Sequence, residues 1–290
     1  MRIASSVAAG VALWLSASVS GVALAQSADT SGKIQYSLFN PVPDDRMDEF
    51  TTDRPTKADV PFTVDAGHFQ YETDLVNFTN QIGSSGHTDT LLAPNPTFKL
   101  GVTNTIDLEL SVALISGVHA FSPATGASST IWGVGDVYAR AKINLWGGEG
   151  SATAFALFPY IKAPTAPPGI GNGAVEGGLI APLAIELPYE FTLLINTEFD
   201  AFKDSVGDGR HANYANLVNL NHEVIKDVTL YVEFWSDYNN DPVQKTMQYS
   251  FDTALSWTVR PNLQLDIGAN FGLNSATPNL QLYAGMSQRF

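Results

Sequence analysis

From residue 68 to the C-terminus, apolar residues recur at every second position. In residues 262–272, for example, Leu265, Ile267 and Phe271 alternate with polar or small residues. The same pattern is clear in residues 105–116, 135–147, 228–238, 246–259 and 280–290. A period of two places successive side chains on opposite faces of a β-strand. The pattern therefore predicts long strands with one apolar and one polar face.

The first 25 residues have the organisation of a secretory signal peptide. Arg2 supplies a positive charge, residues 7–24 form an uncharged apolar core, and Ala23-Leu24-Ala25 is a small-x-small cleavage site. A membrane-spanning helix is the alternative, but Ala, Ser and Gly dilute the stretch and no charged stop follows it. We predict that the chain is exported and cleaved after residue 25.

No later window holds the roughly 20 consecutive apolar residues that a membrane helix requires. If the exported protein lies in a membrane, a closed β-barrel is the remaining way to span it, because lipid cannot satisfy free backbone groups. Short turns are predicted at 103–104, 147–150, 187–190, 226–227 and 260–261, and longer polar links at 79–88, 117–130, 163–174, 203–212 and 239–245. This alternation is typical of outer-membrane barrels, which have short periplasmic turns and longer external loops.

A soluble β-sandwich is the rival fold, since its strands also have one apolar face. The strand length of about ten residues or more favours a barrel, as does the loop alternation. Aromatic residues near strand ends resemble an interfacial girdle: Trp146, Tyr189, Trp235, Tyr238 and Trp257. We predict an all-β fold, a transmembrane antiparallel up-and-down β-barrel of about 12 strands.

Two segments alternate poorly. Residues 89–102 contain Pro94 and Pro96, which central strands avoid, so the strand count is ten if this strand is lost. Residues 174–187 contain Gly177-Gly178 and Pro182, which predict a bend or bulge.

Composition excludes several classes of function. The formal net charge of −14 argues against nucleic-acid binding, which requires a basic surface. The chain has no cysteine, so neither disulfides nor thiolate metal sites are available. No cofactor is predicted.

The C-terminal strand ends on Phe290, as in outer-membrane barrels, where the terminal aromatic is part of the signal read by the barrel-assembly machinery. Several motifs in order resemble the outer-membrane transporter family named for a meta-pathway of phenol degradation. They are Phe50-Thr51-Thr52-Asp53-Arg54-Pro55, Pro61-Phe62-Thr63-Val64, Pro94-Asn95-Pro96, Gly133-x-Gly135-Asp136, Pro159-Tyr160-x-Lys162-x-Pro164-Thr165 and Glu176-Gly177-Gly178. The resemblance spans roughly residues 48–290 and implies an exported barrel of a channel class in the outer membrane, but no particular substrate.

If the apolar faces meet lipid, the polar faces line the lumen. Candidate lumen or constriction residues are Arg140, Lys142, Lys162, Asp136, Glu109, Asp107, Glu233, Asp252 and Asp266. One interpretation is a charge-selective constriction, in which the basic residues face the acidic ones. The other is a salt-bridged lumen that keeps a narrow barrel filled and rigid. The excess of acids favours cations or neutral solutes if a pore is open.

The barrel is predicted to occupy residues 67–290 and to follow an N-terminal arm, residues 26–66. Asp53 and Arg54 lie in this arm, just before the first strand. The arm is either a plug that enters the lumen and pairs with wall charges, or a periplasmic tail whose Arg54 caps the rim.

Enzymatic and metal sites are not predicted. The five histidines are scattered, and no HxH or HExxH spacing occurs. We predict an outer-membrane channel for passive uptake of small solutes, with aromatic or other hydrophobic compounds as candidates. The partners would be outer-membrane lipid, the assembly machinery and a small-molecule solute. A non-conducting structural or adhesive barrel is the alternative.

Overall fold

The computed structural model describes residues 35–83, 86–148 and 150–290. The predicted signal peptide and the first residues of the arm lie outside this part of the chain. The strands are β1 (Phe69–Gly83), β2 (Gly86–Leu92), β3 (Asn95–Thr103), β4 (Ile106–Ser111), β5 (Ser116–Ser122), β6 (Ala127–Gly133), β7 (Val137–Trp146), β8 (Thr153–Ala163), β9 (Glu176–Leu187), β10 (Phe191–Lys203), β11 (Arg210–Ile225), β12 (Val228–Asn239), β13 (Thr246–Arg260), β14 (Leu263–Gly272) and β15 (Leu280–Arg289). Two short 3₁₀ turns, η2 (Asp44–Arg46) and η3 (Pro188–Glu190), complete the described elements. Among these residues no helix has the length and apolar character needed to cross a membrane.

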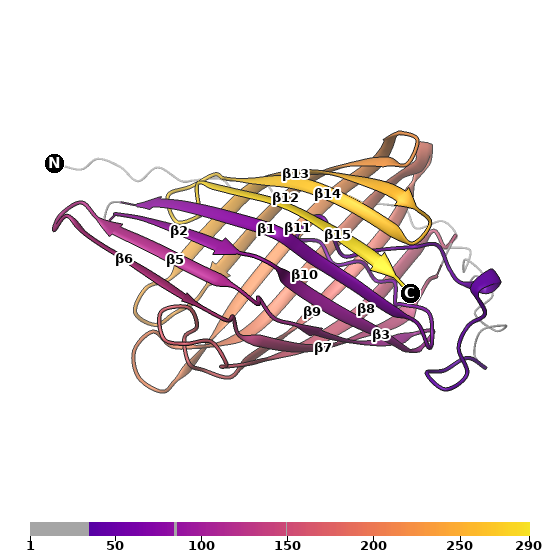
Figure 1. Cartoon of the computed structure of the whole chain (residues 1–290), viewed down its shortest axis with the longest axis horizontal. Helices are drawn as coiled ribbons and strands as arrows, with labels where there is room; N and C mark the ends of the chain where they lie inside the picture. The colour runs from indigo at the N-terminus through magenta and orange to yellow at the C-terminus, as the bar shows by residue number, and fades with distance from the viewer. Residues whose placement is uncertain (1–34, 84–85, 149) are drawn as a thin grey trace, which may run out of the picture.

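The strands form one antiparallel sheet that closes where β15 pairs with β1 (Figure 1). Three wall strands are each interrupted once, so that β2 continues into β3, β4 into β5, and β6 into β7. The described wall is therefore a closed barrel of 12 strands, as predicted. The C-terminus and the indigo chain before β1 lie at the same end of the barrel (Figure 1).

The prolines interrupt their strand without removing it. Pro94 separates β2 from β3, and Pro96 lies within β3 opposite Thr73 of β1. Although proline has no N–H to donate, both carbonyls still accept hydrogen bonds, from Leu114 N to Pro94 O at 2.9 Å and from Val112 N to Pro96 O at 3.1 Å. The wall thus continues past the break, and the smaller count of ten strands is wrong.

Two predicted loops are strands. Residues 79–83 and 86–92 pair with each other, and residues 116–122 pair with 127–133. These stretches extend the barrel at the end opposite the C-terminus (Figure 1). Apolar and polar residues do not alternate clearly in these stretches, which is why periodicity missed them. A strand outside the bilayer needs no continuous apolar face. The links predicted at 163–174, 203–212 and 239–245 do lie between strands, as do all five predicted short turns.

Of the bend or bulge predicted in residues 174–187, the bulge is not found. The register of β9 does not shift against either neighbour, and Pro182 stands opposite Asn196 of β10. One bulge lies instead in β1, between Asp74 and Val76, where this strand meets β15.

Burial is the reverse of that in a soluble protein. On β14, outward-facing Ile267 is 59% exposed, whereas inward-facing Asp266 is 4% exposed. Outward apolar side chains exposed on a closed barrel match a lipid-facing surface. Trp235 is an exception to the predicted girdle, because its register places it on the inner face, where Lys57 Nζ lies 5.0 Å from the ring centroid.

Candidate functional site

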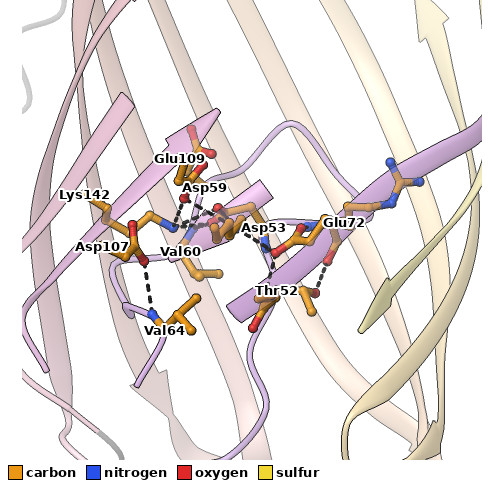
Figure 2. A network of polar contacts seen from close by, with 12 residues as sticks. Thr52, Asp53, Asp59, Val60, Val64, Glu72, Asp107, Glu109 and Lys142 are labelled. Atoms are coloured by element: carbon orange, nitrogen blue, oxygen red, sulfur yellow. Dashed lines mark hydrogen bonds and ion pairs between the residues drawn. The ribbon is translucent and has the colours of Figure 1, made fainter. Parts of the chain in front are cut away.

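Part of the chain before β1 runs inside the barrel, against the inward-facing residues of the wall (Figure 2). Residues 50–64 of this chain, called here the luminal segment, have no regular secondary structure. Their backbone N–H groups cannot pair with one another, and a buried N–H needs an acceptor. Wall carboxylates supply it: Glu72 accepts from the amides of Asp53 and Arg54, and Asp107 accepts from Val64 N at 3.0 Å.

On the far side of the lumen, Glu233 of β12 also accepts hydrogen bonds from backbone N–H groups of the luminal segment. Its two carboxylate oxygens accept from Lys57 N at 3.3 Å and from Ala58 N at 3.2 Å. Ala58 packs in an apolar cluster with Leu194 and Leu217 of the wall. The luminal segment therefore contacts both sides of the barrel interior.

Asp53 occupies the centre of a buried charge cluster (Figure 2). Its carboxylate accepts from Lys142 Nζ at 2.7 and 2.8 Å and is also bonded to Lys99. Lys99 further pairs with Glu72 at 2.6 Å, and both lysines lie within 3.7 Å of Glu109. Burial alone raises the pKa of Asp53, but the charges of Lys142 and Lys99 outweigh it and hold that pKa well below its usual range.

Arg54 makes a second set of ion pairs. Its guanidinium donates to Asp266 Oδ2 at 3.0 Å and Oδ1 at 2.5 Å, and to Asp74 Oδ1 at 2.6 Å. Such forked contacts fix both position and orientation. Lys57 makes the third attachment, to Asp252 and to Ser250 Oγ of β13.

A polar cavity of about 300 Å³ lies between the luminal segment and the wall. Asp59 and Thr56 line it from the luminal segment, and Arg140 and Glu198 line it from the wall. The guanidinium of Arg140 lies 5.6 Å from the Tyr138 ring centroid and 5.8 Å from that of Phe158. The cavity is large enough for a few water molecules or one small solute.

The predicted lumen residues lie at positions whose side chains face inward, within a strand or, for Asp136, just before one. They do not form a single ring. Lys142, Asp107, Glu109, Glu233, Asp252 and Asp266 contact the luminal segment or its immediate partners. Lys162 lies apart and pairs with Asp136 at 3.3 Å and Glu176 at 2.7 Å, beside the link between β8 and β9. Phe290 pairs through its backbone with Phe69, with N···O distances of 2.8 and 3.3 Å.

Sequence reasoning missed Lys57. It also missed a group of three residues, Asp204 and Asp241 in the links that follow β10 and β12 and His211 at the start of β11. His211 Nδ1 lies 2.9 Å from Asp204 Oδ1 and 3.7 Å from Asp241 Oδ2. Asp241 is held by the backbone amides of Ser205, Val243 and Gln244, so the group ties two links together. Only strand register reveals that these links are neighbours.

The fold and its polar, occupied lumen define an outer-membrane β-barrel protein. The profile of the family described as "Putative MetA-pathway of phenol degradation" matches residues 52–290, and the chain belongs to this family. Among curated proteins no sequence matches the chain.

One solved structure shows the same fold, and others align more weakly. The COG4313 outer membrane channel from Pseudomonas putida F1 aligns with a TM-score of 0.66 and 13% identity, covering 83% of this chain and 100% of that one. The NanC porin aligns with a TM-score of 0.48 and 11% identity, covering 76% and 98%. The CymD monoaromatic hydrocarbon channel aligns with a TM-score of 0.41 and 9% identity, covering 77% and 87%. Absence of enzymatic activity stays a prediction.

Proposed function

We propose that the protein is an outer-membrane channel for passive uptake of small solutes, with the luminal segment as its plug. The observation that carries the proposal is the triple attachment of this segment, by Asp53, Arg54 and Lys57, to charges of the wall. Ion pairs of this kind hold a segment in one place, yet they can exchange for water when the segment moves. The 12-strand wall is wide enough for a pore once the lumen is vacated.

The class of solute rests on family membership, which supports aromatic compounds as candidates. The charged cavity beside Arg140 and Glu198 suits small solutes with a polar group better than wholly apolar ones. Arg140, Lys142 and the wall acids would then set charge selectivity once the plug moves. Lys162, bound beside the link between β8 and β9, would act at the external mouth.

The experiment is single-channel recording in planar bilayers of the refolded chain and of Asp53→Asn. Asp53→Asn keeps the shape of the side chain but removes the charge that binds Lys99 and Lys142. We expect rare, small openings in the parent and frequent, larger openings in this variant. Asp45→Asn is the matched control, because Asp45 is exposed in η2, before the luminal segment.

Equal conductance of Asp53→Asn and Asp45→Asn would refute the role of the luminal segment as a plug. Absence of current in the parent, in both variants and after deletion of residues 35–66 would refute the channel and favour a structural barrel. Current that appears in Asp53→Asn alone would support both parts of the proposal.

A further inference from the structure

The barrel closes at one seam, between its first strand and its last. β1 and β15 pair from Gln70 with Arg289 to Asn80 with Leu280. No turn joins these two strands, and the partners are 200 to 219 positions apart in sequence. Pairing of such distant segments carries a large entropic cost of loop closure. Of the strand pairs in the described wall, this pair is therefore the one whose formation is least favoured by a short connection in sequence.

Arg54 spans this seam on the inner face. Its guanidinium binds Asp74 of β1 on one side and Asp266 of β14 on the other. Between them stands Gly285 of β15, where an added Cβ would lie 2.2 Å from Arg54 Nη2. The guanidinium thus lies directly over the backbone of the last strand, and a side chain at Gly285 would displace it.

Neighbouring residues repeat the arrangement. Thr51 O accepts from Gln70 of β1 at 2.8 Å, whereas Thr52 Oγ1 accepts from Gln264 of β14 at 3.1 Å. Farther along, Asp48 O accepts from Arg289 of β15 at 2.9 Å. Residues 48–54 therefore contact the first strand and both of the last two strands.

We infer that residues 48–54 are a clasp that closes the barrel, a function beyond solute passage. The clasp is covalently attached only a short distance before β1, so it stays close to that strand throughout folding. When it binds Asp266 and Gln264, it brings β14 and β15 to β1 at high effective concentration. The attachment at Lys57 differs, because Lys57 binds β13 and does not bridge the seam.

The test compares Arg54→Gln with Lys57→Gln by hydrogen exchange of the refolded barrel, read by mass spectrometry. Both variants remove one cation of the luminal segment, but only Arg54 bridges the seam. We expect exchange in peptides from β1 and β15 to be roughly tenfold faster in Arg54→Gln, as loss of a charge-assisted hydrogen bond implies. Peptides from β10 and β11 should be unchanged, and Lys57→Gln should leave the seam at the parent rate.

A second pair of variants decides the matter if Arg54→Gln does not refold. Asp266→Asn removes the partner of Arg54, and Asp252→Asn removes the partner of Lys57; both side chains are buried on the inner face. The proposal requires faster exchange at β1 and β15 in Asp266→Asn alone. Equal effects of the two variants at the seam, or no effect of either, would overturn it. The outcome is independent of conductance, so a failed channel proposal would leave this result standing.

Discussion

A charge placed at mid-depth on the outer face should destabilise the barrel strongly. Ile267 lies four residues beyond Leu263, where β14 begins at the end that holds the C-terminus. With a rise of about 3.3 Å per residue and a strand tilt of about 40°, Ile267 stands about 10 Å above that end. This height is close to the middle of an apolar band about 25 Å tall.

Ile267→Arg should therefore cost about 2–4 kcal/mol in free energy of unfolding. That cost lowers the folding equilibrium constant roughly 30- to 1,000-fold. Leu265→Arg, two residues nearer the membrane surface, should cost less. The assay is denaturant unfolding of the barrel in lipid vesicles, followed by fluorescence of the four tryptophans that lie after the predicted signal peptide.

Ser128→Arg is the matched control. Ser128 is exposed on β6, in the polar extension at the other end of the barrel, where a charge remains in water. We expect a cost of about 0–1 kcal/mol. Equal costs for Ile267→Arg and Ser128→Arg would refute the assignment of the outer face of β14 to lipid.

Three further predictions concern the lumen and the external links. Arg140→Gln removes a cation from the cavity lining and should raise cation preference, measured as a shift of reversal potential in a salt gradient. A short thiol cross-linker between Thr56→Cys and Asn219→Cys, whose parent side chains are hydrogen-bonded at 3.2 Å, should suppress large openings, because the chain has no other cysteine. Hydrogen bonds from Ser205 and its neighbours lower the pKa of Asp241 to about 2, so this carboxylate stabilises the link above its unfolded pKa of 3.8 and loses that effect as pH falls through about 2. Pepsin cleavage at the links after β10 and β12 should therefore rise between pH 4 and pH 2, and Asp241→Asn should abolish the step.

Periodicity predicted the wall wherever the strand meets lipid, because there the two faces have opposite chemistry. It failed at the links predicted at 79–88 and 117–130, where strands continue the wall but apolar and polar residues do not alternate clearly. The length of the strands was therefore underestimated at one end of the barrel, whereas the short turns at the other end were located correctly. Pro94 and Pro96 illustrate a different limit of sequence reasoning. Neither has an N–H to donate, but their carbonyl groups accept hydrogen bonds that maintain the pairing of the wall.

The site was less accessible to sequence reasoning than the wall. Asp53 and Arg54 stand adjacent in sequence, yet one binds β3 and β7 and the other binds β1 and β14. A segment without regular structure has no period, so its partners follow only from the closed barrel around it. The sequence could indicate that wall acids exceed wall bases, but not that several of these acids accept backbone N–H groups of the luminal segment.

The attachments of the luminal segment constrain how a pore could form. If Arg54 holds the seam, complete withdrawal of the segment would weaken the wall that must remain closed while solute passes. Movement of residues 56–64 alone avoids this conflict, because their wall contacts lie on β4 and on β7 to β13, away from the seam. Asp53 lies in the clasp, but its carboxylate also accepts from Val60 N at 2.8 Å. Its bonds to Lys99 and Lys142 would then be the hinge contacts. Opening by partial release therefore reconciles a mobile plug with a barrel that stays shut along its seam.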